Sequence, residues 1–297
     1  MKNEFRLAND SFLREKEEEK EKPDKIFFLS VEGNRTEVEY FTKLSKYRVS
    51  LGINARIDVE VLKRRKTDTN SAPSAVTDLL DEFMDLRDLD RDENGLIQEI
   101  SPLLGHQIKA TVIKQYINNP ESLEHDTFDK ISMALENANY DLIYRKYLRQ
   151  RSNEGDEFGI VIDCDRQAHK KAGLIRCLNY CKKKQYQCYI TNPCFEFWLL
   201  LHLVDVKRDY HDRMDEILEN KRDSQAHTFV SKEVSNLAGH GKYSIEFESK
   251  YLAHIDEAIQ RAKCFESDEY QIVEKVGTNL WRLIERLRMS ETVVGNY

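Results

Sequence analysis

The chain has 297 residues, of which 40% are hydrophobic and 33% are charged, a balance typical of a globular protein rather than a disordered one. Only 5 prolines and 11 glycines are present, which excludes collagen-like and linker-dominated architectures. The net charge of −7 argues against a histone-like, non-specific coat on nucleic acid, although local basic clusters can still contact a polyanion.

Apolar segments in this chain are short, and this bears on where the protein resides. The longest apolar run, residues 195–201, is interrupted by Glu196 and cannot span a bilayer. The first residues mix acids and bases and contain no apolar signal-peptide core. Because 6 cysteines are scattered through a chain without a secretion signal, we expect reduced thiols and a soluble, cytoplasmic protein with no membrane association.

The first half of the chain alternates strand and helix patterns. Residues 1–24 are charge-dense and predict a polar N-terminal arm, and Lys25–Val31 is an all-apolar run of the kind buried on both faces of a parallel sheet. Residues 34–47 carry apolar side chains at spacings of three and predict a helix. Residues 57–61 alternate apolar and acidic side chains, which predicts a strand near a sheet edge, and residues 76–84 predict another helix.

The middle of the chain contains a long interruption of this alternation. The stretch from residue 85 to residue 157 is longer than a simple crossover needs, and its helical patterns predict an inserted subdomain at about residues 90–155. A third buried strand is predicted at Phe158–Ile162, followed by a helix at residues 168–184 and a fourth strand at Gln187–Ile190.

From Pro193 onward the pattern is helical. Asn192 is the expected N-cap of the first of these helices, with Pro193 at its first position, and Thr278 is the expected N-cap of the last one. The predicted helices are Cys194–Leu203, Tyr210–Asn220, Ser249–Cys264 and Thr278–Met289.

This order of elements predicts an α/β fold with a doubly wound, mainly parallel four-stranded sheet, a helical insertion and a helical C-terminal region. In such sheets ligands bind beyond the carboxyl ends of the strands, where the winding direction reverses. If the first and third strands are neighbours there, Glu32 and Asp163 come together although they are far apart in the sequence.

Acidic residues follow both of those strands. In extended backbone Asp163 and Asp165 point the same way, so both can present oxygens to one ion, and Glu32 adds a third carboxylate. Hard cations such as Mg²⁺ prefer oxygen ligands. Gly33 allows the backbone to approach a phosphate closely. The alternative is that these acids are local caps, with Glu37 capping the first turn of its helix and Asp163 capping the helix that follows it.

Several strings in this sequence resemble the RloB family, whose members carry a Toprim-like domain and occur in bacterial defence loci, often beside an ATPase. The resemblance covers most of residues 25–290 and departs from the family at about residues 90–155. It divides the chain into a Toprim-like domain at residues 25–205 and a helical C-terminal region at residues 206–297. The strings are Val31-Glu32-Gly33-x-x-Thr36-Glu37, Asp163-x-Asp165-Arg166, the segment Asn192–His202 and the segment Gly277–Leu287.

The resemblance implies an acidic metal site used for phosphodiester chemistry. Carried over by residue, Asp163 and Asp165 would bind Mg²⁺ or Mn²⁺, and Glu32 would act as general acid/base or as a further metal ligand. Glu196 lies among aromatic residues at a helix start, where a buried carboxylate is costly unless it is paired or bound to a metal. We place Glu196 near the site, the alternative being that it points outward or pairs with an arginine. His202 is expected to be structural.

Basic residues flank the proposed acidic site. A cation near the scissile phosphate stabilises the charge of the transition state, although any one of these residues can equally be a solvated surface charge. The run Lys63–Lys66 follows the second strand and is a further candidate for contact with a nucleic-acid backbone. The residues that flank the site are Arg35, Arg166, Lys170 and Lys171.

The resulting hypothesis is a Mg²⁺- or Mn²⁺-dependent, Toprim-type nuclease that hydrolyses DNA or RNA in antiviral defence by abortive infection, with an ATPase partner implied by the resemblance. Its rival is a non-catalytic metal- or nucleotide-binding effector or scaffold that partners a defence ATPase. The third alternative is a structural α/β protein whose acidic residues are caps.

Overall fold

The computed structural model describes residues 23–33, 35–62, 72–88, 93–105, 108–138, 140–142, 145–146, 155–165, 171–224, 227–239 and 247–290. The chain forms two compact units. One is built mainly from Asp81–Ser152, and the other mainly from Glu21–Arg64, Asp68–Leu80 and Asn153–Tyr297.

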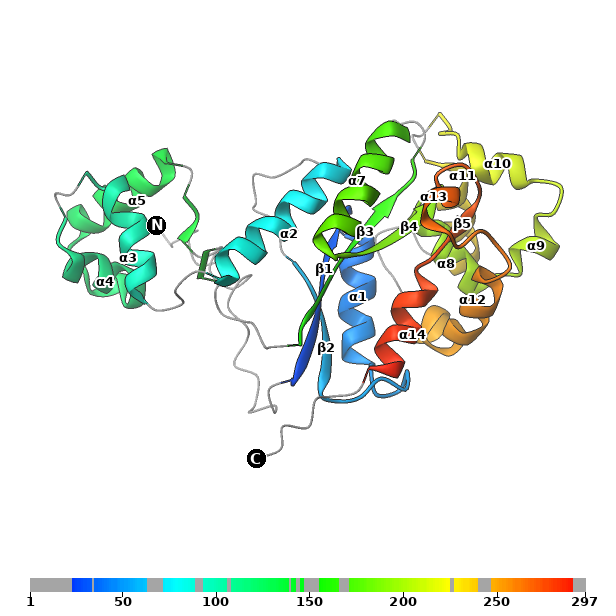
Figure 1. Ribbon diagram of the computed structural model, residues 1–297, viewed down its shortest axis with the longest axis horizontal. Helices are drawn as coiled ribbons and strands as arrows, with labels where there is room; N and C mark the ends of the chain where they lie inside the picture. Colours follow the sequence, from blue (N-terminus) through cyan, green and yellow to red (C-terminus); the bar gives the residue numbers. More distant parts are fainter. Residues whose placement is uncertain are drawn as a thin grey trace. The chain divides into compact units, whose positions relative to one another are not determined.

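The larger unit contains a five-stranded sheet of order β2-β1-β3-β4-β5 (Figure 1). Four strands are parallel, which confirms the predicted mixed α/β class with a mainly parallel sheet. The predicted strand count of four is wrong, because a two-residue strand pairs antiparallel with β4. A strand of two residues is too short to show the alternation of apolar and polar side chains by which strands are predicted from sequence. The strands are β1 Lys25–Val31, β2 Ile57–Val61, β3 Glu157–Asp163, β4 Gln187–Asn192 and β5 Gly277–Thr278.

Side-chain chemistry explains the places of β1 and β2 in the sheet. β1 is apolar along its length, and it lies between β2 and β3 with residues 26–31 buried. β2 alternates buried apolar residues with the half-buried Asp58 and Glu60, and it forms one edge of the sheet. The edge position predicted from this alternation is confirmed.

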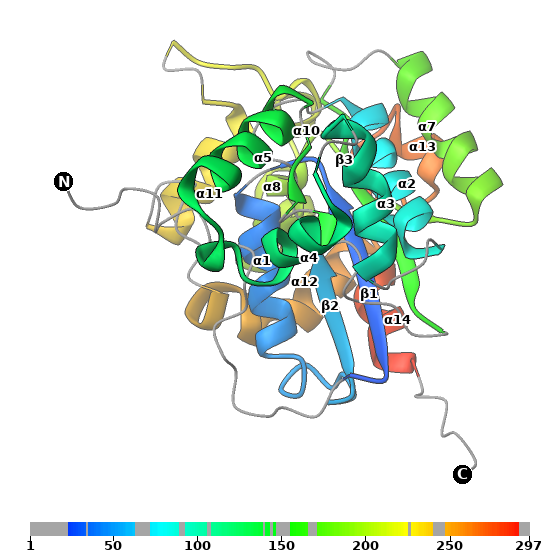
Figure 2. The same ribbon diagram turned by 90° about the vertical axis from the view of Figure 1, so that its left-hand side faces the viewer.

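Helices pack on both faces of the sheet. Phe27, Leu29 and Val31 of β1 share one core with α1 (Thr36–Lys46) and with helices from the C-terminal part of the chain. On the other face the hydroxyl of Ser30 donates to the carbonyl oxygen of Val76 in α2 (Pro73–Asp88) at 2.7 Å. α7 (Lys171–Lys184) lies on the opposite side of the strands from α1 in both ribbon views (Figures 1 and 2).

The centre of the larger core is α8 (Phe195–Leu203). Apart from Glu196 and Leu203, all of its residues are buried, so it is apolar around its whole circumference as a fully enclosed helix should be. Its neighbours in the core are α11 (Phe229–Ala238), α12 (Ile255–Ala262) and α14 (Trp281–Met289).

Both helix starts predicted in the C-terminal half are wrong. Asn192 ends β4, its side-chain amide donates to the carbonyl oxygen of Ile272 at 2.6 Å, and Cys194 is the N-cap of α8. Thr278 belongs to β5, where its hydroxyl bonds to that of Thr191 at 2.8 Å, and α14 starts at Trp281. In both cases the side chain makes a tertiary hydrogen bond, and the Thr278 hydroxyl in addition accepts from the Leu280 amide at 3.2 Å.

Two predicted helices are shorter and more divided than expected. Of the predicted helix Tyr210–Asn220 only α10 (Met214–Glu219) is present, and a separate short helix, α9 (Val206–Asp209), precedes the segment. α9 begins earlier because the side chain of Asp205 accepts a hydrogen bond from the Arg208 amide and caps it. Ser249–Cys264 contains three elements, η3 Phe247–Tyr251, η4 Leu252–His254 and α12.

The smaller unit is helical and has its own core. Its elements are α3 (Glu93–Leu103), α4 (Ala110–Asn118), η2 (Pro120–Ser122) and α5 (His125–Asn137). They bury apolar residues against one another and overlap the segment expected to be an insertion. Among the helices described in either unit, none combines the length and apolar character needed to cross a membrane. The core residues of the smaller unit are Leu96, Ile100, Leu104, Ile113, Ile117, Ile131 and Leu135.

Candidate functional site

Glu32 and Asp163 meet at the carboxyl ends of β1 and β3. The two strands are parallel neighbours, with Val31 opposite Val161, and the Glu32 amide continues the ladder by donating to the Val161 carbonyl oxygen at 3.1 Å. The amide of Asp163 donates to Oε2 of Glu32, also at 3.1 Å. The strand order therefore places these two acids at one point although 131 positions separate them in the chain.

Glu37 turns back from the first helical turn of α1 toward the same end of the sheet. Its Oε1 accepts a hydrogen bond from the Gly33 amide at 3.1 Å, and only 7% of the residue is exposed. A Cβ atom at position 33 would lie 2.0 Å from Oε2 of Glu37, so only glycine leaves room for this carboxylate. The structural reason for Gly33 is thus the buried position of Glu37.

Glu196 lies in the first turn of α8, in the same charged region. Burial, together with repulsion from the like charges of Glu196 and Glu32, raises the pKa of Glu37 to about 7. Burial also raises the pKa of Asp163, with additional contributions from Glu32, Glu37 and Glu196. We call Glu32, Glu37, Asp163 and Glu196 the carboxylate cluster.

The start of α8 partly compensates the charge of the cluster. A backbone hydrogen bond from Phe195 to the carboxylate of Asp163 lowers its pKa, and the N-terminus of a helix favours negative charge. This effect is smaller than the burial and repulsion that raise the pKa of Asp163. Burial likewise raises the pKa of the neighbouring Cys194 thiol, which therefore stays protonated.

The structure places the other predicted site residues outside the strongest interactions of this cluster. Asp165 follows β3 and pairs with Arg222 at 3.7 Å, and it is not among the main influences on the pKa of Asp163. Lys171 is exposed and pairs with Glu274, and Arg35 is exposed at the N-cap of α1. Arg166, Lys170 and Lys63–Lys66 lie outside the described residues.

His202 belongs to the aromatic core rather than to the cluster. Its Nδ1 bonds to the carbonyl oxygen of Trp198 at 2.9 Å and its Nε2 to the hydroxyl of Tyr40 at 3.3 Å. Burial lowers the pKa of His202 to about 3, so the ring is neutral at physiological pH. This environment accords with the structural role expected for it.

The donor chemistry of the carboxylate cluster fits a hard divalent cation, because every member offers carboxylate oxygens. The pKa values of Glu37 and Asp163 are raised because burial and like-charge repulsion disfavour their ionised forms, a cost that a proton or a cation would relieve. As the side chains lie, no three His, Cys, Asp or Glu residues in the described part of the chain converge on one ion position. Binding of a cation therefore requires the carboxylates to rotate, and Glu32 can offer Oε1 while its Oε2 keeps the bond from the Asp163 amide.

Glu37 is the site residue that the sequence did not single out. Its position in the first turn of a helix pointed to a capping role, and the bond from the Gly33 amide is indeed of that local kind. The available signal was the short spacing between Gly33 and Glu37 directly after Glu32. That spacing indicates a functional carboxylate only when the structure shows that the Glu37 side chain in α1 points toward β3.

A comparison with protein-family models gives a match to the RloB-like protein model over residues 27–287. The chain belongs to the RloB-like protein family. The match runs from β1 to α14 and so contains all four members of the carboxylate cluster, and it confirms the resemblance seen in the sequence motifs. A search of curated proteins and a search of solved structures gave no significant match.

Proposed function

We propose that this RloB-like chain is a Mg²⁺- or Mn²⁺-dependent nuclease with a Toprim-like, doubly wound domain, and that it hydrolyses phosphodiester bonds of DNA or RNA in antiviral defence. The observation that carries the proposal is the gathering of Glu32, Glu37, Asp163 and Glu196 at the ends of neighbouring parallel strands. Family membership supports the Toprim-like fold and the defence role, with an ATPase as partner, through the resemblance described above.

All four carboxylates of the cluster would contribute to the cation site, and Glu37 would in addition exchange a proton. A divalent cation bound here would neutralise charge on a phosphate and lower the pKa of water. Asp163, Glu32 and Glu196 would supply oxygen ligands, and Asp165 stands two residues beyond the end of β3 to add another. Glu37, with a pKa of about 7, is suited to exchange a proton near neutral pH, which is the property that a general acid or base needs.

The test is cleavage of labelled DNA and RNA panels with Mg²⁺ or Mn²⁺ by the wild type, Asp163→Asn, Glu32→Gln and Glu37→Gln. Asp215→Asn, which changes an exposed carboxylate on α10, is the matched control. We expect losses of about a hundredfold or more for the cluster variants, the size typical of lost acid–base or metal-ligand groups. Cleavage that persists unchanged in Asp163→Asn and Glu32→Gln would remove the nuclease assignment.

A non-catalytic, metal- or nucleotide-binding effector is the second candidate. The bond between the Asp163 amide and Glu32 favours it, because this pair is satisfied without an ion. It predicts saturable Mn²⁺ binding, lost in Asp163→Asn, with no turnover of any nucleic acid even when the proposed ATPase partner is added.

A further inference from the structure

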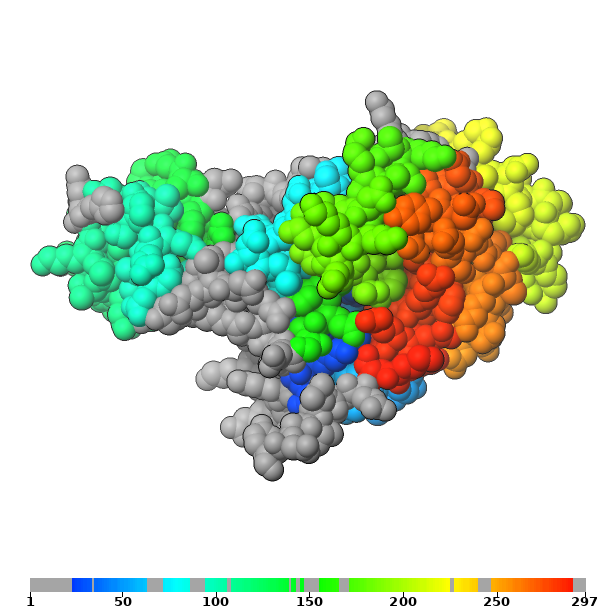
Figure 3. All heavy atoms as spheres, in the orientation of Figure 1, coloured from blue at the N-terminus to red at the C-terminus, as the bar shows by residue number. Residues whose placement is uncertain are grey.

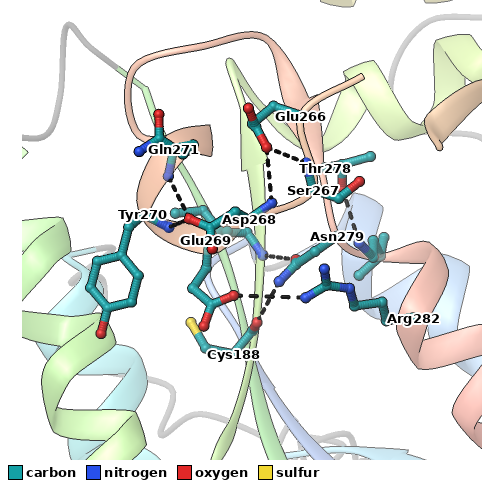
Figure 4. Close-up of polar contacts among 12 residues, drawn as sticks. Cys188, Glu266, Ser267, Asp268, Glu269, Tyr270, Gln271, Thr278, Asn279 and Arg282 are labelled. Atoms are coloured by element: carbon teal, nitrogen blue, oxygen red, sulfur yellow. Dashed lines mark hydrogen bonds and ion pairs between the residues drawn. The ribbon is translucent and has the colours of Figure 1, made fainter. Parts of the chain in front are cut away.

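A cavity of about 330 Å³ lies over the outer edge of β4, away from the carboxylate cluster. Leu178, Cys181 and Lys182 of α7 line it on one side, and Arg282 and Arg286 of α14 line it on the other. Arg282 is seen in Figure 4 beside Glu269, Asn279 and Cys188. The surfaces of α7 and α14, green and red in Figure 3, adjoin on the face shown there. A volume of this size is at the lower end of the range for small-molecule sites.

The position of the cavity along β4 separates it from the proposed catalytic site. The cavity contacts Gln187, Cys188 and Tyr189 at the amino end of the strand, whereas Asp163 lies opposite Thr191 near the carboxyl end. At about 3.3 Å per residue, Cys188 and Thr191 are on the order of 10 Å apart. A ligand in the cavity therefore has its own set of contacts.

The floor of the cavity is held by a buried side chain. Oδ1 of Asn279 accepts from the Ile190 amide at 2.7 Å, and its Nδ2 donates to the carbonyl oxygen of Cys188 at 3.0 Å. β5 pairs with β4 only at Thr191 and Asn192, so among the described residues this amide takes the place of a strand along the edge (Figure 4). The Asn279 side chain thus occupies the Ile190 amide and the Cys188 carbonyl oxygen, so this part of the edge cannot pair with another strand and is left for a ligand.

The lining of the cavity is cationic in an acidic protein. Lys182, Arg282 and Arg286 contribute three positive charges, and Glu269 of α13 (Glu269–Ile272) contributes one negative charge. Arg282 pairs with Glu269 at 3.7 Å, and Arg286 pairs with Glu157. Each guanidinium has five N–H donors, so both arginines keep donors for an anion while they hold these carboxylates.

Tyr189 lies in the same wall, with its hydroxyl enclosed by protein atoms rather than open to the cavity. Its hydroxyl is buried and has no hydrogen-bond partner among the described residues, and leaving such a group unsatisfied is costly. Burial raises the pKa of Tyr189, so the hydroxyl keeps its proton. Gly159 leaves space for the ring, because a Cβ there would lie 3.2 Å from Cε2 of Tyr189.

We propose that this cavity binds a small, phosphate-bearing organic anion of the size of a nucleoside monophosphate. Lys182, Arg282 and Arg286 hold the phosphate, and Tyr186 and Tyr189 supply the aromatic part of the lining. The proposal is independent of the nuclease assignment, because it uses none of the residues of the carboxylate cluster.

Isothermal titration calorimetry of the full chain in EDTA tests the proposal, with AMP, GMP, CMP, UMP, adenosine and inorganic phosphate as probes. We expect at least one nucleotide to bind more tightly than adenosine and inorganic phosphate. Lys182→Ala and Arg282→Gln should weaken that binding about tenfold each, while Lys183→Ala, an exposed neighbour on α7, should not change it. Asp163→Asn should also bind normally. Absence of nucleotide binding, or equal binding of inorganic phosphate, would overturn the proposal.

Two cysteines provide a second, internal measure of where the ligand sits. Cys188 is half-buried in the cavity lining, and Cys264 is exposed elsewhere. Bound nucleotide should slow alkylation of Cys188 by iodoacetamide several-fold and leave Cys264 unaffected, as followed by mass spectrometry. Equal protection of both thiols, or of neither, would place the nucleotide elsewhere. Protection of Cys188 by single-stranded DNA but by no mononucleotide would overturn the proposal in favour of a nucleic-acid contact.

Discussion

The backbone amide of Asp163 donates to the carboxylate of Glu32 at 3.1 Å, across two strands that are 131 positions apart in the chain. This bond holds one acid in place with the backbone of another, at a point where burial and repulsion already raise the pKa of Asp163. The cluster therefore has two ways to relieve its charge, uptake of a proton or uptake of a cation. Because a proton and a cation would compete for the same carboxylates, the site can be tested by measuring stability against pH and metal, without an activity assay.

Ionisation of Glu37 should make the fold less stable as the pH rises. Its pKa is raised from 4.5 to about 7, so the contribution of the protonated group is fully present below pH 4.5 and is lost as the pH rises through 7. Glu37→Gln has no such loss. In EDTA, the difference in free energy of unfolding between Glu37→Gln and the wild type should shift in favour of the variant from pH 5 to pH 8, by on the order of 2–3 kcal/mol. Urea denaturation measures this, with the exposed Glu257→Gln as control; a pH-independent difference would contradict it.

Divalent cations should stabilise the chain more at high pH. Protons and cations compete for the same carboxylates, so Mn²⁺ or Mg²⁺ should raise the Tm by several degrees at pH 8 and by less at pH 6. Asp163→Asn should remove most of this shift. Differential scanning fluorimetry with and without the metal gives the comparison, and an equal shift in the wild type and Asp163→Asn would show that the cation binds elsewhere.

Gly33→Ala should impair cation binding more than it impairs folding. The new Cβ would lie 2.0 Å from the Glu37 carboxylate, which must swing away and give up its bond from the Gly33 amide. Because a carboxylate is the mobile end of its side chain, we expect a loss of stability of only about 1 kcal/mol. Mn²⁺ affinity, measured by calorimetry, should fall about tenfold.

Gly173→Ala provides the matched control for that experiment. A Cβ at position 173 in α7 meets no atom closer than 4.0 Å, and alanine favours a helix over glycine by about 0.5–1 kcal/mol. Gly173→Ala should therefore bind Mn²⁺ normally and be at least as stable as the wild type. Normal Mn²⁺ binding by Gly33→Ala would mean that Glu37 does not contribute to the cation site.

Asn279→Ala should destabilise the edge of the sheet. It leaves the Ile190 amide and the Cys188 carbonyl without the side-chain partner that satisfies both, at a cost of about 2–4 kcal/mol in the free energy of unfolding. Asn179→Ala removes one exposed hydrogen bond, to the hydroxyl of Tyr270, and should cost less than about 1 kcal/mol. Equal urea midpoints for the two variants would show that water replaces Asn279 without loss.

Local patterns predicted the parts of the fold in which burial and periodicity agree. β1 and β2 end at the predicted residues, because an apolar run fits a strand covered on both faces and an alternating pattern fits a strand at the sheet edge. Thr278 did not follow its local pattern, since a hydroxyl that can cap a helix can equally bond to Thr191 on a neighbouring strand. The helix α9, which ends just before the predicted segment Tyr210–Asn220, had a local signal in the cap at Asp205.

The amino-acid sequence by itself determined the α/β class, the positions of the parallel strands, the family and the placing of Glu32 and Asp163 at strand ends, because each follows from residue types at short range. The tertiary structure alone decided that Glu37 joins them, that Asp165 pairs with Arg222, and that a cationic cavity opens at the edge of β4. The physical reason is that burial and electrostatic repulsion depend on distances between side chains, and strand order sets those distances for residues far apart in the chain.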